Sequence, residues 1–168
     1  MALFYPTVYH RRITDITVEE LHEMGVKGLL LDVDNTLTTH GSQNLSDDVR
    51  DWLDTMKKAD IRMTVVSNSW EWRVAPFADR IGLRHTSLSC KPLPFGFLRG
   101  IRRLQLKRHE CLAIGDQVFT DIIGANLCGV RCVQLQPILL ETGKPILKLK
   151  RQLERWLYKK KWGEEYDR

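Results

Sequence analysis

The sequence lacks any long apolar run, and this absence excludes an ordinary membrane-spanning helix. No stretch approaches the roughly 18 consecutive apolar residues that such a helix needs. The N-terminal segment, MALFYPTVYHRR, is apolar first and basic second, which is the reverse of a secretory signal, and no small-residue cleavage site follows it. We therefore expect a cytoplasmic protein.

The chain also lacks paired cysteines, internal repeats and low-complexity linkers. None of its four cysteines stands in a CxxC pair, so we expect reduced thiols in or near the core, as is usual in the cytoplasm. Without a linker, residues 1–168 are assigned to one domain with a core at 27–135. The only plausible boundary within it lies from Pro137 to Pro145, between the predicted sheet and the basic C-terminal segment.

Acidic residues are scarce in the segment that precedes the last seven residues. Between Lys144 and Lys161 the chain has eight Lys or Arg residues and one acid, Glu154. This excess is larger than the net charge of the whole chain, +5, so the rest of the chain is slightly acidic. We expect any anionic partner to meet the basic end first.

Apolar periodicities of strand and helix type alternate along the chain. Strands are predicted near 27–33, 61–66, 83–87, 111–114 and 130–135, with helices near 18–24, 46–58, 69–81, 94–104, 122–127 and 145–159. Residues 1–16 are predicted to be irregular. The alternation predicts a Rossmann-like, three-layer α/β/α sandwich around a mainly parallel sheet of five strands.

Polar residues follow four of these strands, and ligands bind where the strands of such a sheet end. The residues are Asp32, Asp34, Ser67, Asn68, Lys91, Asp116 and Asp121. Carboxylate oxygens suit Mg²⁺, and a bound cation lets carboxylates lie close to an anionic substrate. A hydroxyl and a lysine among them could bind phosphate.

The residues DVDNT, Ser67, Lys91 and GDQVFTD occur in the order of the four motifs of the haloacid dehalogenase superfamily of phosphatases, which the chain resembles over residues 27–135. The beginning of the chain (an apolar residue before proline, HRRITDI, then KGLLLDVDNTLT) and its basic C-terminal helix are similar to a narrower group. That group is the YqeG-type phosphatases of subclass IIIA, related to the phosphatidylglycerophosphate phosphatases of mitochondria and plastids.

The resemblance implies a phosphoric monoester hydrolase that works through an aspartyl-phosphate intermediate. It implies that Asp32 is the nucleophile and that Asp34 is the general acid and then the general base. The implied Mg²⁺ ligands are Asp32, the carbonyl of Val33, Asp34, Asp116 and Asp121. The implied phosphate-binding residues are Ser67, Asn68 and Lys91.

Several of these residues have a second interpretation. Asp121 could instead support the first turn of a helix through the helix dipole. Thr36 is either a partner of Asp34 or a loop residue. Trp70 fits the apolar face of the helix at 69–81 and is expected in the core. Trp72 falls off that face and is a candidate for contact near the site.

The short gaps between motifs leave no room for a cap domain. Eight residues separate Leu37 from Ser46, and much of the gap between Ser67 and Lys91 is one helix. An uncovered site favours a phosphate presented by something large, such as a membrane surface. The resemblance implies phosphatidylglycerophosphate as the favoured substrate, with support from the open site and the basic C-terminal end, and the alternatives are a soluble or protein-borne phosphate.

The helix predicted at 145–159 carries an apolar stripe flanked by basic residues, and it has two interpretations. The stripe could pack on the domain with its charges solvated, or it could lie on anionic lipid at the inner face of the membrane. A nucleic-acid partner would use the same charges and is ranked lower, because no aromatic platform for bases is recognised among them. An RNA- or ribosome-associated protein with a vestigial site is the alternative from another functional class.

Overall fold

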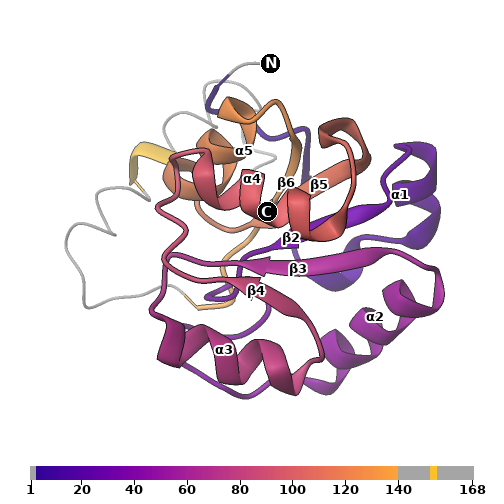
Figure 1. Ribbon diagram of the computed structural model, residues 1–168, viewed down its shortest axis with the longest axis vertical. Coiled ribbons are helices and arrows are strands. Elements are labelled where there is room, and N and C mark those ends of the chain that lie inside the picture. Colours follow the sequence, from indigo (N-terminus) through magenta and orange to yellow (C-terminus); the bar gives the residue numbers. More distant parts are fainter. Residues whose placement is uncertain (1–2, 140–151, 155–168) are drawn as a thin grey trace. The chain divides into compact units, whose positions relative to one another are not determined.

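The computed structural model describes residues 3–139 and 152–154, and its centre is a parallel sheet of six strands in the order β1-β6-β5-β2-β3-β4 (Figure 1). The strands are β1 (Val8–His10), β2 (Gly28–Leu31), β3 (Arg62–Val66), β4 (Arg84–Thr86), β5 (Cys111–Gly115) and β6 (Arg131–Leu135). This order places β2 and β5 side by side in the middle of the sheet. The predicted α/β class with a parallel sheet is confirmed.

Helices cover both faces of the sheet, because alternate side chains of the central strands are buried on opposite sides. The helices and helical turns are η1 (Ile13–Asp15), α1 (Val18–Glu23), α2 (Asp47–Lys58), α3 (Glu71–Arg80), α4 (Phe95–Leu104), η2 (Arg108–Glu110), η3 (Val118–Ile122) and α5 (Ile123–Leu127). Figure 1 shows α2 and α3 on one side of the sheet and α4 and α5 on the other.

The two faces are packed differently. Leu29 and Leu31 of β2 belong to a large apolar cluster that includes Trp52 of α2 and Phe77 of α3. On the other face α4 comes very close to the sheet, since a Cβ on Gly100 would lie 2.7 Å from a methyl carbon of Leu30. Burial on both faces explains why β2 is a continuous apolar run.

The N-terminal residues are not irregular as predicted, because β1 adds a sixth strand beside β6. The amide of Thr7 donates to the carbonyl of Cys132, and the side chain of Asn126 donates to the carbonyls of Leu3 and Tyr5. A strand of three half-buried residues has too weak an alternation to be recognised in the sequence.

Two predictions about buried residues were wrong. Trp70 caps the N-terminus of α3 instead of lying on its apolar face, and it is 63% exposed. Cys90 is also exposed, whereas the other three cysteines are buried, where burial raises the pKa of the Cys132 thiol to about 12.

The chain divides into two compact units after Ile138, within the boundary predicted from Pro137 to Pro145. Of the helix predicted at 145–159, the described residues 152–154 are helical and the others lie outside the described part of the chain. The assignment of one domain to residues 1–168 stays a prediction. Within the described ranges, no helix combines the length and hydropathy needed to cross a membrane.

Candidate active site

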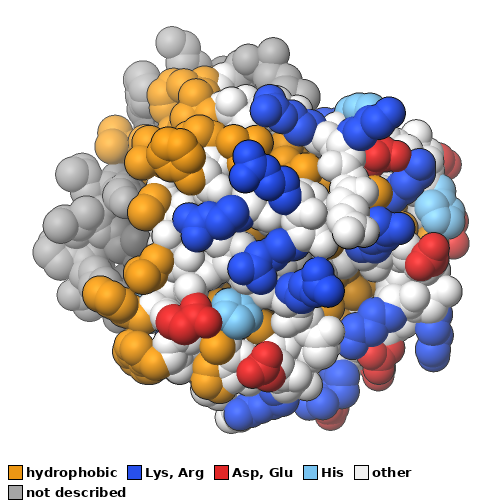
Figure 2. All heavy atoms as spheres, in the orientation of Figure 1, with side chains coloured by type: hydrophobic (Ala, Val, Ile, Leu, Met, Phe, Trp, Pro, Cys, Tyr) orange, Lys and Arg blue, Asp and Glu red, His pale blue; other side chains and the backbone are white. Residues whose placement is uncertain are grey.

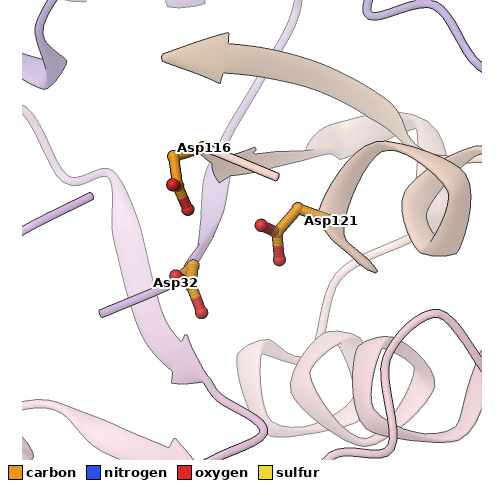
Figure 3. A group of neighbouring side chains, drawn as sticks. All are labelled: Asp32, Asp116 and Asp121. Carbon is orange, nitrogen blue, oxygen red and sulfur yellow. The ribbon is translucent and has the colours of Figure 1, made fainter. Parts of the chain in front are cut away.

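Three carboxyl groups meet where the two central strands end. Asp32 follows β2, Asp116 follows β5, and Asp121 lies in η3, which continues from β5. Each offers an oxygen within 4.8 Å of the others, and all three residues are buried (Figure 3). We call Asp32, Asp116 and Asp121 the acidic cluster. Two adjacent parallel strands necessarily deliver their ends to one place, so the cluster follows from the sheet topology.

Lys91 reaches the acidic cluster from the loop after β4. Its Nζ lies 2.5 Å from Asp32 Oδ1, 2.6 Å from Asp121 Oδ1 and 2.9 Å from the carbonyl oxygen of Val66. The ammonium group thus uses all three donors on buried acceptors. Burial acts to lower the pKa of Lys91, but the attraction of Asp121 and Asp32 outweighs it and raises the pKa above its usual value.

Two close contacts hold these groups in place. A Cβ on Gly115 would lie only 2.4 Å from Cγ of Asp121, so the glycine is what allows Asp121 to approach the end of β5. The side chain of Asn68 accepts from the amide of Lys91 at 2.7 Å and donates to the carbonyl of Lys91 at 2.9 Å. Asn68 thereby fixes the backbone of the residue that places the ammonium group.

The environment makes Asp32 harder to ionise than an ordinary aspartate. Burial, opposed by Lys91 and reinforced by Asp121, raises the pKa of Asp32 from 3.8 to about 7. Thr36 lies in the turn after β2, which confirms its interpretation as a loop residue. Its hydroxyl lies 3.5 Å from Asp32 Oδ2, so Thr36 adjoins Asp32 and not Asp34. A cation beside the cluster would favour the ionised form.

Asp34 lies outside the acidic cluster, although residues two apart on a strand would share a face. The strand ends at Leu31, and Asn35 has a left-handed backbone with φ of 61°, which turns the chain. The carboxylate of Asp34 accepts from Arg73 Nη2 at 2.9 Å and from Ser69 Oγ at 3.0 Å. The amide of Gly41 donates to it at 3.0 Å.

These donors change the electrostatics of Asp34. Burial alone would raise its pKa, but the amide of Gly41, Arg73 and Ser69, with His40 at 3.8 Å, lower the pKa below 3.8. Arg73 is itself only 8% exposed, and its Nη1 has no hydrogen-bond partner among the described residues. Arg73 is not among the residues predicted from the sequence, since its only signal is a cation in the first turn of the helix that follows Ser67.

Two further predicted metal ligands have contacts of their own in the structure. The carboxylate of Asp34 is directed to Arg73, Ser69 and Gly41 instead of to the acidic cluster. The carbonyl of Val33 accepts from the amide of Leu37 at 3.0 Å, within the turn that follows β2. A carbonyl oxygen has two lone pairs, so one remains for a cation, and the ligand role of Val33 stays a prediction.

Ser67 and Asn68, two of the predicted phosphate ligands, follow β3 at the edge of the sheet where the acidic cluster lies. Ser67 is buried, and its Oγ accepts from the amide of Ser69 at 3.1 Å. Asn68 faces the loop of Lys91 with its side chain, which leaves only its backbone for the predicted contact with phosphate.

The acidic cluster fits a divalent cation that prefers oxygen ligands. The three buried carboxyl groups, when ionised, carry three negative charges, and the ammonium group of Lys91 carries one positive charge. A divalent cation would balance the two negative charges that remain. Oxygen donors from one or a few carboxylates are the pattern for Mg²⁺. Asp32, Asp116 and Asp121 are the residues that would hold it.

Two family models match this chain. The model for haloacid dehalogenase-like hydrolases matches residues 41–129. The model for mitochondrial PGP phosphatase matches residues 1–73, which include Asp32 and Asp34.

The relatives cover most of the chain. A protein of Bacillus subtilis (strain 168) named "Probable phosphatase YqeG" is 36% identical over 152 residues, or 90% of this chain and 88% of that protein. An uncharacterized protein from Listeria monocytogenes serotype 4b has a similar structure, with a TM-score of 0.57 at 19% identity over 71% of this chain and 85% of the other. CbbY from Rhodobacter sphaeroides has a TM-score of 0.54 at 15% identity, covering 71% of this chain and 89% of its own.

Proposed function

The chain belongs to the haloacid dehalogenase-like hydrolases and is a phosphatase, and from this premise we propose that it is a Mg²⁺-dependent phosphomonoesterase acting through Asp32. The observation that supports the proposal most directly is the acidic cluster with Lys91 at the end of the central strands. It combines a buried carboxylate nucleophile with the charges that a phosphoryl group requires.

The first step uses Asp32 and Asp34 in different roles. A carboxylate oxygen of Asp32 attacks phosphorus, the bond from phosphorus to the leaving oxygen breaks, and Asp34 gives that oxygen a proton. The lowered pKa means that Asp34 is ionised in the free protein. The negative charge of the arriving phosphate raises the pKa and so favours uptake of the proton that Asp34 then donates.

The second step returns Asp32 to its starting state. Asp34, now a carboxylate, takes a proton from water, and the water oxygen attacks the phosphorus of the aspartyl-phosphate. Inorganic phosphate leaves and the carboxylate of Asp32 is restored. Lys91 exchanges one of its present acceptors for a phosphoryl oxygen, with Ser67 and the backbone of Asn68 at the same edge. Bound Mg²⁺ would neutralise charge on the phosphoryl oxygens and keep Asp32 ionised.

We infer that the substrate is phosphatidylglycerophosphate at a membrane surface. The match to the PGP phosphatase model over residues 1–73 supports this substrate, as does the absence of any inserted cap between β2 and β3 or between β3 and the loop of Lys91. The leaving group of this substrate contains a phosphodiester, which carries a second negative charge. We therefore expect a second anion-binding site on the protein.

A cavity beside the predicted site has suitable chemistry for that second anion. It has a volume of about 460 Å³ and adjoins Thr36, the neighbour of Asp32. Arg11 and Arg12 line it together with apolar side chains such as Leu135 and Ile138. Cations beside an apolar wall suit a phosphodiester linked to a lipid glycerol.

The enzyme itself is tested with a soluble aryl phosphate. Release of phosphate should require Mg²⁺, stop with EDTA and fall by on the order of 10⁴-fold or more in Asp32→Asn, because the nucleophile is lost. Absence of turnover by the wild-type protein with Mg²⁺ present would refute the proposal.

The substrate is tested by comparing rates on phosphatidylglycerophosphate in vesicles with rates on soluble phosphomonoesters. We expect a clear preference for the lipid, reduced when Arg11 and Arg12 are both changed to Gln. Equal rates on both substrate classes would remove the lipid assignment and leave a phosphatase for soluble or protein-borne phosphate.

A further inference from the structure

Five large apolar side chains are exposed on the two loops that carry the predicted phosphate ligands and on the first turns of α3 and α4, which follow these loops. These side chains, which we call the apolar rim, belong to Trp70, Trp72, Leu88, Leu93 and Phe95. The two tryptophans follow Asn68 within four residues, and the other three lie within four residues of Lys91. The exposed fractions of Trp72 and Phe95 are 75% and 59%. Single exposed apolar residues are ordinary, but five on two loops around one site need a partner.

A run of basic side chains begins one helical turn beyond the apolar rim. This basic band consists of Arg99, Arg102, Arg103, Lys107 and Arg108, all exposed. Phe95, Arg99 and Arg102 share one outward face of α4, because their spacing is that of successive turns. Figure 2 shows Lys and Arg side chains over the face formed by α4 and β4, with apolar side chains along the margin where the strands end. The chain has no Asp or Glu between residues 91 and 109.

We propose that the apolar rim and the basic band together dock on the surface of an anionic lipid bilayer. The inference rests on the proposed function, since it presents the strand-end site to phosphate groups that stand on that surface. Tryptophan prefers the boundary between headgroups and acyl chains, leucine and phenylalanine enter it, and nearby arginines attract anionic headgroups. The surface is formed by residues of the first compact unit alone, so the proposal does not depend on the basic helix predicted at 145–159.

Charge favours lipid over a second copy of this chain. Two copies joined through the rim would bring their basic bands together, and like charges across an interface are unfavourable. The acid nearest in sequence to the tryptophans, Glu71, is already engaged by His85 at 2.9 Å and by Ser87. The aromatic side chains of the rim could also stack on bases, but Leu88 and Leu93 add apolar surface that a bilayer would bury and single-stranded RNA would leave exposed, which favours the bilayer.

The test is co-flotation of the full chain with vesicles that contain no phosphomonoester. Vesicles of phosphatidylcholine mixed with phosphatidylserine should bind the wild type at least tenfold more tightly than vesicles of phosphatidylcholine alone. The rim variant, Trp72→Ser with Phe95→Ser, and the band variant, with Arg99, Arg102 and Arg103 changed to Gln, should each reduce binding tenfold or more. Both should hydrolyse a soluble aryl phosphate at the wild-type rate, which separates docking from catalysis.

Matched controls change similar residues elsewhere. Leu127→Ser removes an exposed apolar side chain just before β6 begins, at the opposite edge of the sheet, and Arg50→Gln with Lys58→Gln removes two charges from α2. Neither should alter flotation.

Four results would overturn the proposal. They are unchanged binding by the rim variant, equal binding to both vesicle types, a change of oligomeric state of the rim variant in lipid-free solution, and displacement from vesicles by single-stranded RNA. Loss of binding on neutralising Lys159, Lys160 and Lys161 alone, with the rim variant unaffected, would assign docking to the C-terminal segment instead.

Discussion

Asp32 and Asp34 are two residues apart, but their surroundings shift their ionisation in opposite directions. Asp32 is buried beside Asp121, and its pKa is raised to about 7 despite Lys91. Asp34 is half-buried among an amide, a hydroxyl and a guanidinium group, and its pKa is lowered. The comparison shows how two identical side chains of one motif acquire opposite electrostatics, because their burial and neighbours differ. In the proposed reaction bound Mg²⁺ would ionise Asp32 and the arriving phosphate would favour protonation of Asp34.

Among the variants that leave the nucleophile Asp32 in place, Asp34→Asn should have the largest effect, because it removes the proposed proton carrier. Turnover of an alkyl phosphate such as glycerol phosphate should fall by on the order of 10²- to 10⁴-fold, because an alkoxide leaves only with a proton. With 4-nitrophenyl phosphate the first step needs no proton, so stopped-flow measurement should show a burst of nitrophenol followed by slow turnover. A uniform loss on both substrates without a burst would contradict the acid–base role of Asp34.

Lys91→Met tests the surroundings of Asp32. Removing the cation leaves the buried carboxyl groups of the acidic cluster without their partner, so the free energy of unfolding in EDTA should fall by about 3–5 kcal/mol. Urea unfolding measures the loss. Lys27→Met is the control, because its ion pair with Glu110 is exposed and should change the midpoint little. Similar losses in the two variants would show that Lys91 is not the charge that holds the cluster.

A substitution of Arg73 tests the surroundings of Asp34, because we expect Arg73 to position Asp34 without touching substrate. Arg73→Met should lower kcat for an alkyl phosphate roughly tenfold, the effect of losing about 1.4 kcal/mol of interaction, and should leave the nitrophenol burst intact. Arg73→Lys should restore part of the rate. Arg80→Met, on the same helix with a bond to the carbonyl of Gln43, is the control. An equal loss in Arg73→Met and Arg80→Met would reduce Arg73 to a structural residue.

The smallest effect is the dependence of metal stabilisation on pH. Without metal, the raised pKa of Asp32 contributes stability that is full below its unfolded value of 3.8 and is lost as the pH rises through about 7. Because Mg²⁺ needs the ionised form, the rise in Tm on adding Mg²⁺ should be larger at pH 8 than at pH 5.5 by about 2–4 °C. Thermal unfolding of wild type and Asp32→Asn checks this, and equal rises at both pH values in the wild type would contradict it.

Much of the fold could be predicted from local patterns. The helix predicted near 18–24 is present as α1, where the side chain of Thr17 accepts from the amide of Glu20, and β2 lies within the strand predicted near 27–33. The edge strand β1 and the exposure of Trp70 could not be predicted, because they depend on which neighbours cover a short segment. The predicted roles of the site residues stay predictions, but the structure does bring Asp32, Lys91, Asp116 and Asp121 together.

The sequence by itself determined which chemical groups follow the strands and in what order, because an apolar run ending in carboxylates has few other uses in a parallel sheet. Only the tertiary structure decided what each group does there. The approach of Lys91, the turn at Asn35 and the side chain of Arg73 assign opposite electrostatics to two aspartates of one motif, and these contacts join residues far apart in the chain. A pKa reflects spatial neighbours and burial, which sequence spacing does not specify.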